Sequence, residues 1–90
     1  MLRLVRKVVP LGTMERTLCA WEGVTAADLH EGLRNRRVVQ ARRLFCQIAL
    51  PGMGYSGAAV ARFLGVTTSA VNRLAVSEEL PQTRMYLNAL

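Results

Sequence analysis

The stretch Ala59–Leu74, "AVARFLGVTTSAVNRL", predicts two short helices joined by a tight turn. Ala61 is a small residue at the point where the second helix is expected to pack across the first. Four residues later, Gly65 accepts the positive φ that a sharp chain reversal requires. Val71 and Leu74 lie about one helical turn apart, so both are expected to face inward and anchor the second helix.

The polar residues of this stretch favour a DNA-contacting surface. With Val60, Leu64 and Val66 completing a small core, we expect a helix-turn-helix over about residues 56–76. Hydroxyl groups, a carboxamide and a guanidinium are side chains that contact base edges and phosphates in a major groove. We therefore predict that five outward-facing residues contact DNA: Thr67, Thr68, Ser69, Asn72 and Arg73. The alternative is a helical hairpin with no role in DNA binding.

Helical patterns also fill the N-terminal half of the chain. Apolar residues repeat at helical spacing within residues 13–22, and Gly23 marks the end of that helix. Thr25 and Asp28 have the spacing of a capping box, which predicts a second, short helix. A basic turn is expected around residues 34–37.

The segment "VVQARRLFCQIAL", residues 38–50, is the best candidate for a central buried helix ended by Pro51 and Gly52. Its apolar face is expected to comprise Val38, Ala41, Leu44, Phe45 and Ile48.

Capping residues predict the remaining helices. Ser56 is expected to cap a helix over residues 57–64, and Thr67 or Thr68 to cap one that runs to about residue 75 or 76. Pro81 suits the first turn of a last helix. Only "RLVRKVV", residues 3–9, weakly resembles a strand. The predicted fold is a single all-α domain over residues 1–90.

The charge balance indicates a polyanionic partner. Twelve Lys and Arg oppose six acidic residues, giving a net charge of +6, and eleven of the twelve are Arg. The segment "LRNRRVVQARRL" contains no acidic residue and holds Arg34, Arg36, Arg37, Arg42 and Arg43. A run this dense favours contact with a polyanion. The alternative is a solvated face, or pairing of these arginines with Glu22, Asp28 and Glu31.

No constellation for catalysis or metal binding is present in the sequence. Cys19 and Cys46 lack CxxC spacing, so we expect two buried thiols in a reducing compartment. His30, the only histidine, is expected to be an exposed helix residue rather than a base. Nothing would activate Tyr55 or Tyr86 as nucleophiles, and no GxxxxGK[ST] phosphate loop occurs. We predict no enzymatic activity, cofactor, metal or small-molecule substrate.

The N-terminal segment "MLRLVRKVVP" is basic, and its longest uncharged run is too short for a signal-peptide core or a membrane span. We therefore expect a cytoplasmic, nucleoid-associated chain with no membrane partner.

From about Thr17 to Leu80 the chain resembles the C-terminal DNA-binding domain of the bacterial replication initiator DnaA, a Trp-repressor-like helical fold. The order of parts carries the resemblance: a helix, a short "V-x-x-x-D-L" helix, a basic loop, and a long helix that begins with "A-R". "YSGAAVARFLGVTTSAVNRL" then matches the family's helix-turn-helix. Similar domains occur at the C-termini of some bacterial transposase-like proteins.

This resemblance implies two DNA contacts. The recognition helix would place residues 67–69, Asn72 and Arg73 in the major groove, and an arginine of the basic loop, Arg34, Arg36 or Arg37, would reach the adjacent minor groove. The initiator's signature at the start of its recognition helix is Asp-His-Thr-Thr, whereas this chain has Thr-Thr-Ser-Ala at residues 67–70. The transposase-associated version therefore fits better.

Two functional hypotheses follow. The first is a sequence-preferring module for double-stranded DNA. The second is a protein-interaction domain that keeps the DnaA-like fold and docks a partner or a second copy through "LFCQIAL", residues 44–50, or through the tail "MYLNAL", residues 85–90. An additional domain or protein partner is expected if the chain belongs to a larger transposase-like protein.

Overall fold

A computed structural model describes residues 8–31 and 35–90, except for the side chain of Glu31. Over this part the chain is all-helical, as predicted, and no strand occurs within it. The elements are α1 (Leu11–Glu22), α2 (Ala26–Glu31), α3 (Arg36–Gln47), η1 (Ile48–Gly52), α4 (Gly57–Leu64), α5 (Thr68–Val76) and α6 (Pro81–Ala89). Arg34 and most of the weakly strand-like segment 3–9 lie outside the described residues.

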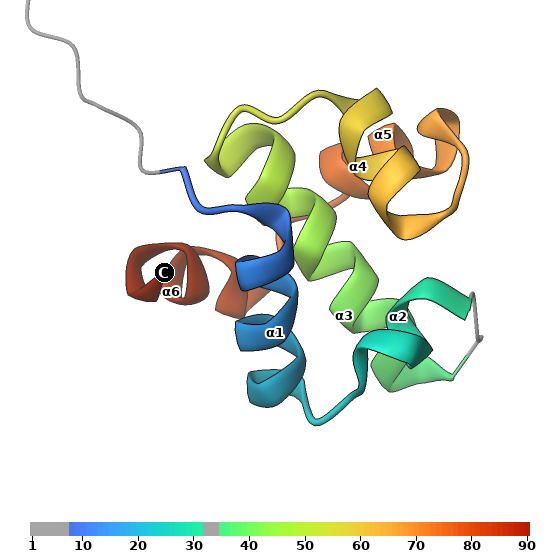
Figure 1. Ribbon diagram of the computed structural model, residues 1–90. Helices are drawn as coiled ribbons and strands as arrows, with labels where there is room; N and C mark the ends of the chain where they lie inside the picture. The colour runs from blue at the N-terminus through green and yellow to red at the C-terminus, as the bar shows by residue number, and fades with distance from the viewer. Residues whose placement is uncertain (1–7, 32–34) are drawn as a thin grey trace, which may run out of the picture.

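Helix α3 is the centre of the fold. It contacts α1, α2, α5 and α6, while α4 packs chiefly on α5. In Figure 1 it runs diagonally through the molecule, with α1 in front of it and α6 on the left. The five predicted core residues of this helical segment are all buried: Val38, Ala41, Leu44, Phe45 and Ile48. A central buried helix is therefore confirmed.

The two ends of α3 differ from the prediction. Arg36 and Arg37 form its first turn rather than a basic turn, because the Asn35 side chain accepts a 2.8 Å hydrogen bond from the Arg37 N–H and caps the helix. At the other end the helix widens into η1, a π-helical turn that contains Pro51. Proline has no N–H and its ring collides with the preceding helical turn, so a wider turn accommodates it before the chain leaves the helix.

The predicted caps are present. Thr25 and Asp28 exchange the two hydrogen bonds of a capping box, at 3.0 and 3.3 Å. The Ser56 hydroxyl accepts from a first-turn N–H of α4, and Thr67, rather than its neighbour, does the same for α5, both at 3.1 Å. Pro81 is the first residue of α6, as predicted. Local hydrogen bonding thus accounts for where these helices begin.

A buried glutamine attaches the C-terminal helix to the core. Gln47, which is 3% exposed, donates from Nε2 to the carbonyl oxygens of Ser77 and Glu78. Its Oε1 accepts from the Leu80 N–H at 3.1 Å and from the Thr83 hydroxyl at 2.7 Å. One side chain of α3 therefore holds the link between α5 and α6.

An aromatic pair makes the second attachment of α6. The ring of Trp21 on α1 stacks on that of Tyr86, with centroids 4.6 Å apart. The Tyr86 hydroxyl donates to Glu22 at 2.7 Å, and this hydrogen bond, with burial, raises the pKa of Tyr86 to about 12. The phenol is therefore neutral at physiological pH and remains a donor to the carboxylate.

Cys19 and Cys46 are free and buried, as predicted. Burial, together with the charges of Glu15 and Asp28, raises the pKa of the Cys19 thiol to about 11. Burial raises that of Cys46 to about 12, although Arg42 opposes the shift. Both thiols are therefore protonated at neutral pH and serve as small apolar core groups.

Candidate nucleic-acid interface

Helices α4 and α5 form a tight pair whose local geometry agrees with the prediction. Gly65 ends α4 with φ +75°, and its N–H donates to the Ala61 carbonyl at 2.8 Å. Ala61 and Val71 are buried, and Leu74 packs half-buried against the same core. Helix α5 is thus held on its inner side by short apolar residues.

The outer side of α5 carries the predicted polar set. Each of its members is exposed: Thr67, Thr68, Ser69, Asn72 and Arg73. The Thr67 oxygen accepts from the Ala70 N–H, so the hydroxyl keeps its own hydrogen for an outside acceptor. The structure therefore brings these five residues together along one short helix and its cap.

Arg36 and Arg37 are also exposed, at the first turn of α3. Gly23 ends α1, as predicted, and has φ +71°. The Arg37 side chain extends over it, because a Cβ added at residue 23 would lie 3.5 Å from Arg37 Nη1. A cation at this point is favourable because the last carbonyl groups of α1 are negative. Both arginines line an open hollow of about 860 Å³, with Trp21 and Asp28 on its wall.

Two of the three carboxylates considered as partners for these arginines are engaged elsewhere. Glu22 accepts from Gln40 and from Tyr86, and Asp28 accepts from the backbone of Thr25. The Glu31 side chain, like Arg34, lies outside the described residues. Among described side chains, no ion pair includes Arg36, Arg37 or Arg73.

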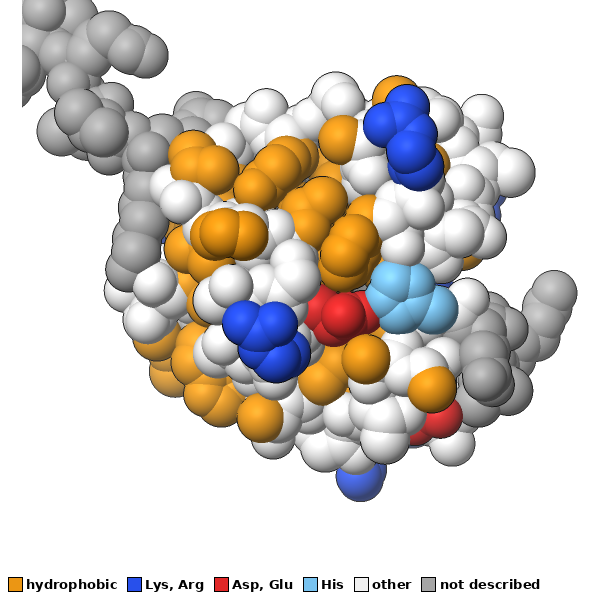
Figure 2. All heavy atoms as spheres, in the orientation of Figure 1, with side chains coloured by type: hydrophobic (Ala, Val, Ile, Leu, Met, Phe, Trp, Pro, Cys, Tyr) orange, Lys and Arg blue, Asp and Glu red, His pale blue; other side chains and the backbone are white. Residues whose placement is uncertain are grey.

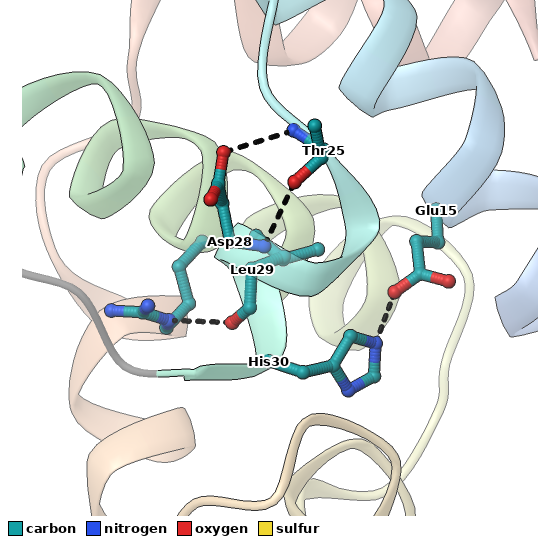
Figure 3. Close-up of polar contacts among 6 residues, drawn as sticks. Glu15, Thr25, Asp28, Leu29 and His30 are labelled. Carbon is teal, nitrogen blue, oxygen red and sulfur yellow. Dashed lines mark hydrogen bonds and ion pairs between the residues drawn. The ribbon is translucent and has the colours of Figure 1, made fainter.

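Arg42 and Arg43 are set apart from this surface. Both are half-buried on α3. Arg42 donates from Nε to the Leu29 carbonyl at 3.4 Å (the unlabelled side chain in Figure 3), and Arg43 donates from Nη2 to the carbonyl of Glu78. These two arginines thus bind the backbone of neighbouring segments. Contact of the arginine run with a polyanion stays a prediction.

His30 is half-buried rather than exposed, which corrects the sequence-based expectation. It pairs with Glu15 of α1 (Figure 3), and its ring meets the edge of Phe63 of α4 at a centroid distance of 5.1 Å. This contact places the end of α2 against the helix pair. In Figure 1 the start of α3, the end of α2 and the turn between α4 and α5 all lie toward the right of the molecule.

The face shown in Figure 2 has a different character. Hydrophobic side chains gather over α1 and the segment that leads into α4, with the histidine and its carboxylate partner at the edge of this area. The arginines visible on this face stand apart from one another. The candidate interface comprises the exposed residues of α5 and of the first turn of α3.

The tyrosines considered as nucleophiles have structural partners. Tyr55 donates to the Val9 carbonyl at 2.7 Å, and Tyr86 to Glu22. Within residues 8–31 and 35–90, no group of three or more His, Cys, Asp or Glu side chains is arranged to hold a metal ion. No helix in the described chain has the length and hydropathy needed to cross a bilayer.

The two segments considered for protein docking differ in accessibility. Residues 44–49 are buried, so "LFCQIAL" forms the core and is closed to a partner, contrary to that hypothesis. In the tail, Met85 is 61% exposed, whereas Tyr86, Leu87 and Leu90 pack against the core. Only one large apolar side chain of the tail is therefore free.

Comparison with protein-family models, with curated proteins and with solved structures found no match to this chain.

Proposed function

We propose that this chain binds double-stranded DNA, with α4 and α5 as a helix-turn-helix and α5 as the recognition helix in the major groove. The observation that carries the proposal is the exposed polar set of α5 on a helix whose opposite side is buried. A helix with its side chains is about 10–12 Å across, and a major groove about 12 Å wide admits it.

Arginines supply the second contact in this proposal. Arg36 and Arg37 reach solvent from the first turn of α3 and would bind phosphates or enter the adjacent minor groove. Arg34 belongs to the same proposed contact but lies outside the described residues. A net charge of +6 adds general attraction to the duplex.

The wider assignment rests on the resemblance to the DnaA C-terminal domain and the transposase-associated version of it. We propose the same Trp-repressor-like arrangement here, in a chain that binds rather than catalyses and acts at the bacterial nucleoid in the cytoplasm. A larger transposase-like or DnaA-related protein would use such a module to select its site.

Selection from a pool of random duplexes, followed by anisotropy titrations across a salt series, tests the proposal. We expect an enriched motif and an affinity that falls steeply with salt. Arg73→Ala should weaken binding and blur the motif. Arg84→Ala is the matched control, because Arg84 is 77% exposed on α6 and its nearest carboxylate, Glu79, is 3.8 Å away. Absence of binding at about 50 mM salt would overturn the proposal.

A double variant separates phosphate contacts from base contacts. Arg36→Ala with Arg37→Ala should weaken binding about equally for all sequences and reduce the salt slope by about 2. The enriched motif should remain. If part of the motif is lost instead, these arginines read bases in the minor groove rather than bind phosphates alone.

The alternative, a protein-interaction domain, has less support. Residues 44–49 of the first docking segment are buried, and Met85 is the main exposed apolar side chain of the second, the tail of residues 85–90. A docking role for the tail predicts that Met85→Lys abolishes partner capture and leaves DNA binding unchanged.

A further inference from the structure

Gly57, the first residue of α4, lies against the side chain of Asn72 on α5. A Cβ at residue 57 would be 2.3 Å from Asn72 Oδ1, 3.2 Å from its Cγ and 3.4 Å from the Thr68 Cγ2 methyl. The first distance is too short for any real contact. The carboxamide of Asn72 therefore occupies the space that a side chain at residue 57 would fill.

We infer that Gly57 is a positioning residue for Asn72: it seats the carboxamide oxygen against α4 and leaves the Nδ2 amide group to face the DNA. This inference rests on the proposed function and deepens it, since it specifies what one residue of the recognition helix can read. Asn72 is exposed, so its side chain is accessible to a ligand.

The chemistry of the contact favours this orientation of the carboxamide. The hydrogen that glycine carries in place of a Cβ points toward the oxygen, which is the geometry of a weak Cα–H···O contact. With the carboxamide turned over, the amide hydrogens would oppose the Cα–H hydrogen. Facing the oxygen inward is therefore the lower-energy arrangement.

The orientation limits which bases Asn72 can recognise. Asparagine reads adenine with both of its polar atoms, through a bidentate pair with N6 and N7. With Oδ1 turned toward α4, Asn72 offers only a donor. Acceptors for it in the major groove are guanine O6 and N7, adenine N7 and thymine O4, whereas cytosine presents only its N4 amino donor. Asn72 should therefore exclude cytosine at one position of the site.

The seating of Asn72 can be tested without DNA. In ¹H–¹⁵N spectra, the Asn72 side-chain amide signals, assigned by their loss in Asn72→Ala, should shift in Gly57→Ala. Gly12→Ala is the matched control: it makes the same change in the first turn of α1, where the new Cβ would meet only Arg16 Nη1 at 3.9 Å. Unchanged Asn72 signals in Gly57→Ala would overturn the positioning role.

The base preference is tested by selection from random duplexes with four proteins. The unaltered chain and Gly12→Ala should disfavour cytosine at one position by about tenfold, the value of one hydrogen bond. Asn72→Asp replaces the donor by an acceptor and should favour cytosine there. Gly57→Ala should lose the preference at that position only and keep the salt slope.

The outcomes separate this inference from the proposed function. If the unaltered chain binds no duplex, the proposed function fails and the base preference fails with it, while the amide spectra still decide whether Gly57 seats Asn72. If the chain selects a site but Asn72→Asp leaves every position unchanged, DNA binding stands and the reading assigned to Asn72 is overturned. Asn72→Asp alters an exposed side chain, so this arm does not depend on how well Gly57→Ala folds.

Discussion

The α4–α5 pair and the junction between α3 and α6 hold their helices by different means. In the pair, a capping hydroxyl at each helix start and one glycine between the helices fix the geometry within a few residues. At the junction, Gln47 reaches partners 30 to 36 residues away, and α6 is secured by a buried side chain rather than by its own cap. The first region follows local rules, whereas the second depends on the completed fold.

The largest loss of stability should come from replacing Gln47, which makes the long-range hydrogen bonds. Gln47→Ala would leave the Leu80 N–H and the Thr83 hydroxyl without their buried acceptor, so we expect a loss of about 3 kcal/mol in the free energy of unfolding. Gln40→Ala is the control, because Gln40 is half-buried and bonded only to Glu22 within the described chain; it should cost under about 1 kcal/mol. Equal losses in urea titrations would contradict the distinction.

A smaller effect is expected at the turn of the pair. Gly65→Ala has open space for its Cβ but must hold φ near +75°, so we expect a loss of about 1–2 kcal/mol from backbone strain alone. Gly12→Ala, inside α1, should instead stabilise the chain by about 0.5–1 kcal/mol. In urea titrations, the two variants should change the free energy of unfolding in opposite directions. If Gly65→Ala leaves it unchanged, the turn does not require a glycine.

The caps of the pair should contribute similarly to each other. Ser56→Ala and Thr67→Ala each remove one side-chain acceptor from a helix start and should each cost about 1 kcal/mol. Thermal unfolding measures both. Because Thr67 also belongs to the proposed DNA surface, only Thr67→Ala should in addition weaken duplex binding.

Alkaline pH should destabilise the fold through groups on α1, α3 and α6, with no effect at neutral pH. Cys19, Cys46 and Tyr86 all lie on α1, α3 and α6, and their pKa values are raised to between about 11 and 12. An unfolded thiol ionises near pH 8.5, so the stability from protonated thiols is fully present below about pH 8.5 and is lost as pH rises toward 12. Urea midpoints between pH 8 and pH 11 should therefore fall, and Cys46→Ala should flatten that slope.

The contrast explains how much of the fold could be predicted from the sequence. Ser56, Thr67 and Gly65 act on neighbours within a few positions, so their types alone indicated where α4 and α5 begin and end. The first turn of α3 differs from the prediction, although an asparagine before a helical run, here Asn35, is a capping signal. The π-helical turn and the Gln47 contacts depend on tertiary packing, which no local pattern encodes.

The candidate site was predictable to the same degree. The exposed side of α5 follows from helical periodicity once Val71 is assigned to the core. The arginine run could not be divided by sequence, because Arg36 and Arg37 have the same chemistry as Arg42 and Arg43. Only the positions of the Leu29 and Glu78 carbonyls distinguish the arginines that bind the backbone from those that face solvent. Gly57 gave no sequence signal, because its role depends on the side chain of Asn72 across the pair.

The stacking of Trp21 on Tyr86 equips the chain with an optical probe of its own. Trp21 is the sole tryptophan and is 39% exposed. It belongs to α1, and its ring stacks on Tyr86 of α6 rather than on a residue of α5. Release of α6 would hydrate the indole and move its emission to longer wavelength, while a ligand on α5 alone would leave the spectrum unchanged. Because Trp21 also lines the hollow beside Arg36 and Arg37, a change in emission on adding duplex would report either contact at that hollow or movement of the C-terminal helix, neither of which an affinity measurement detects.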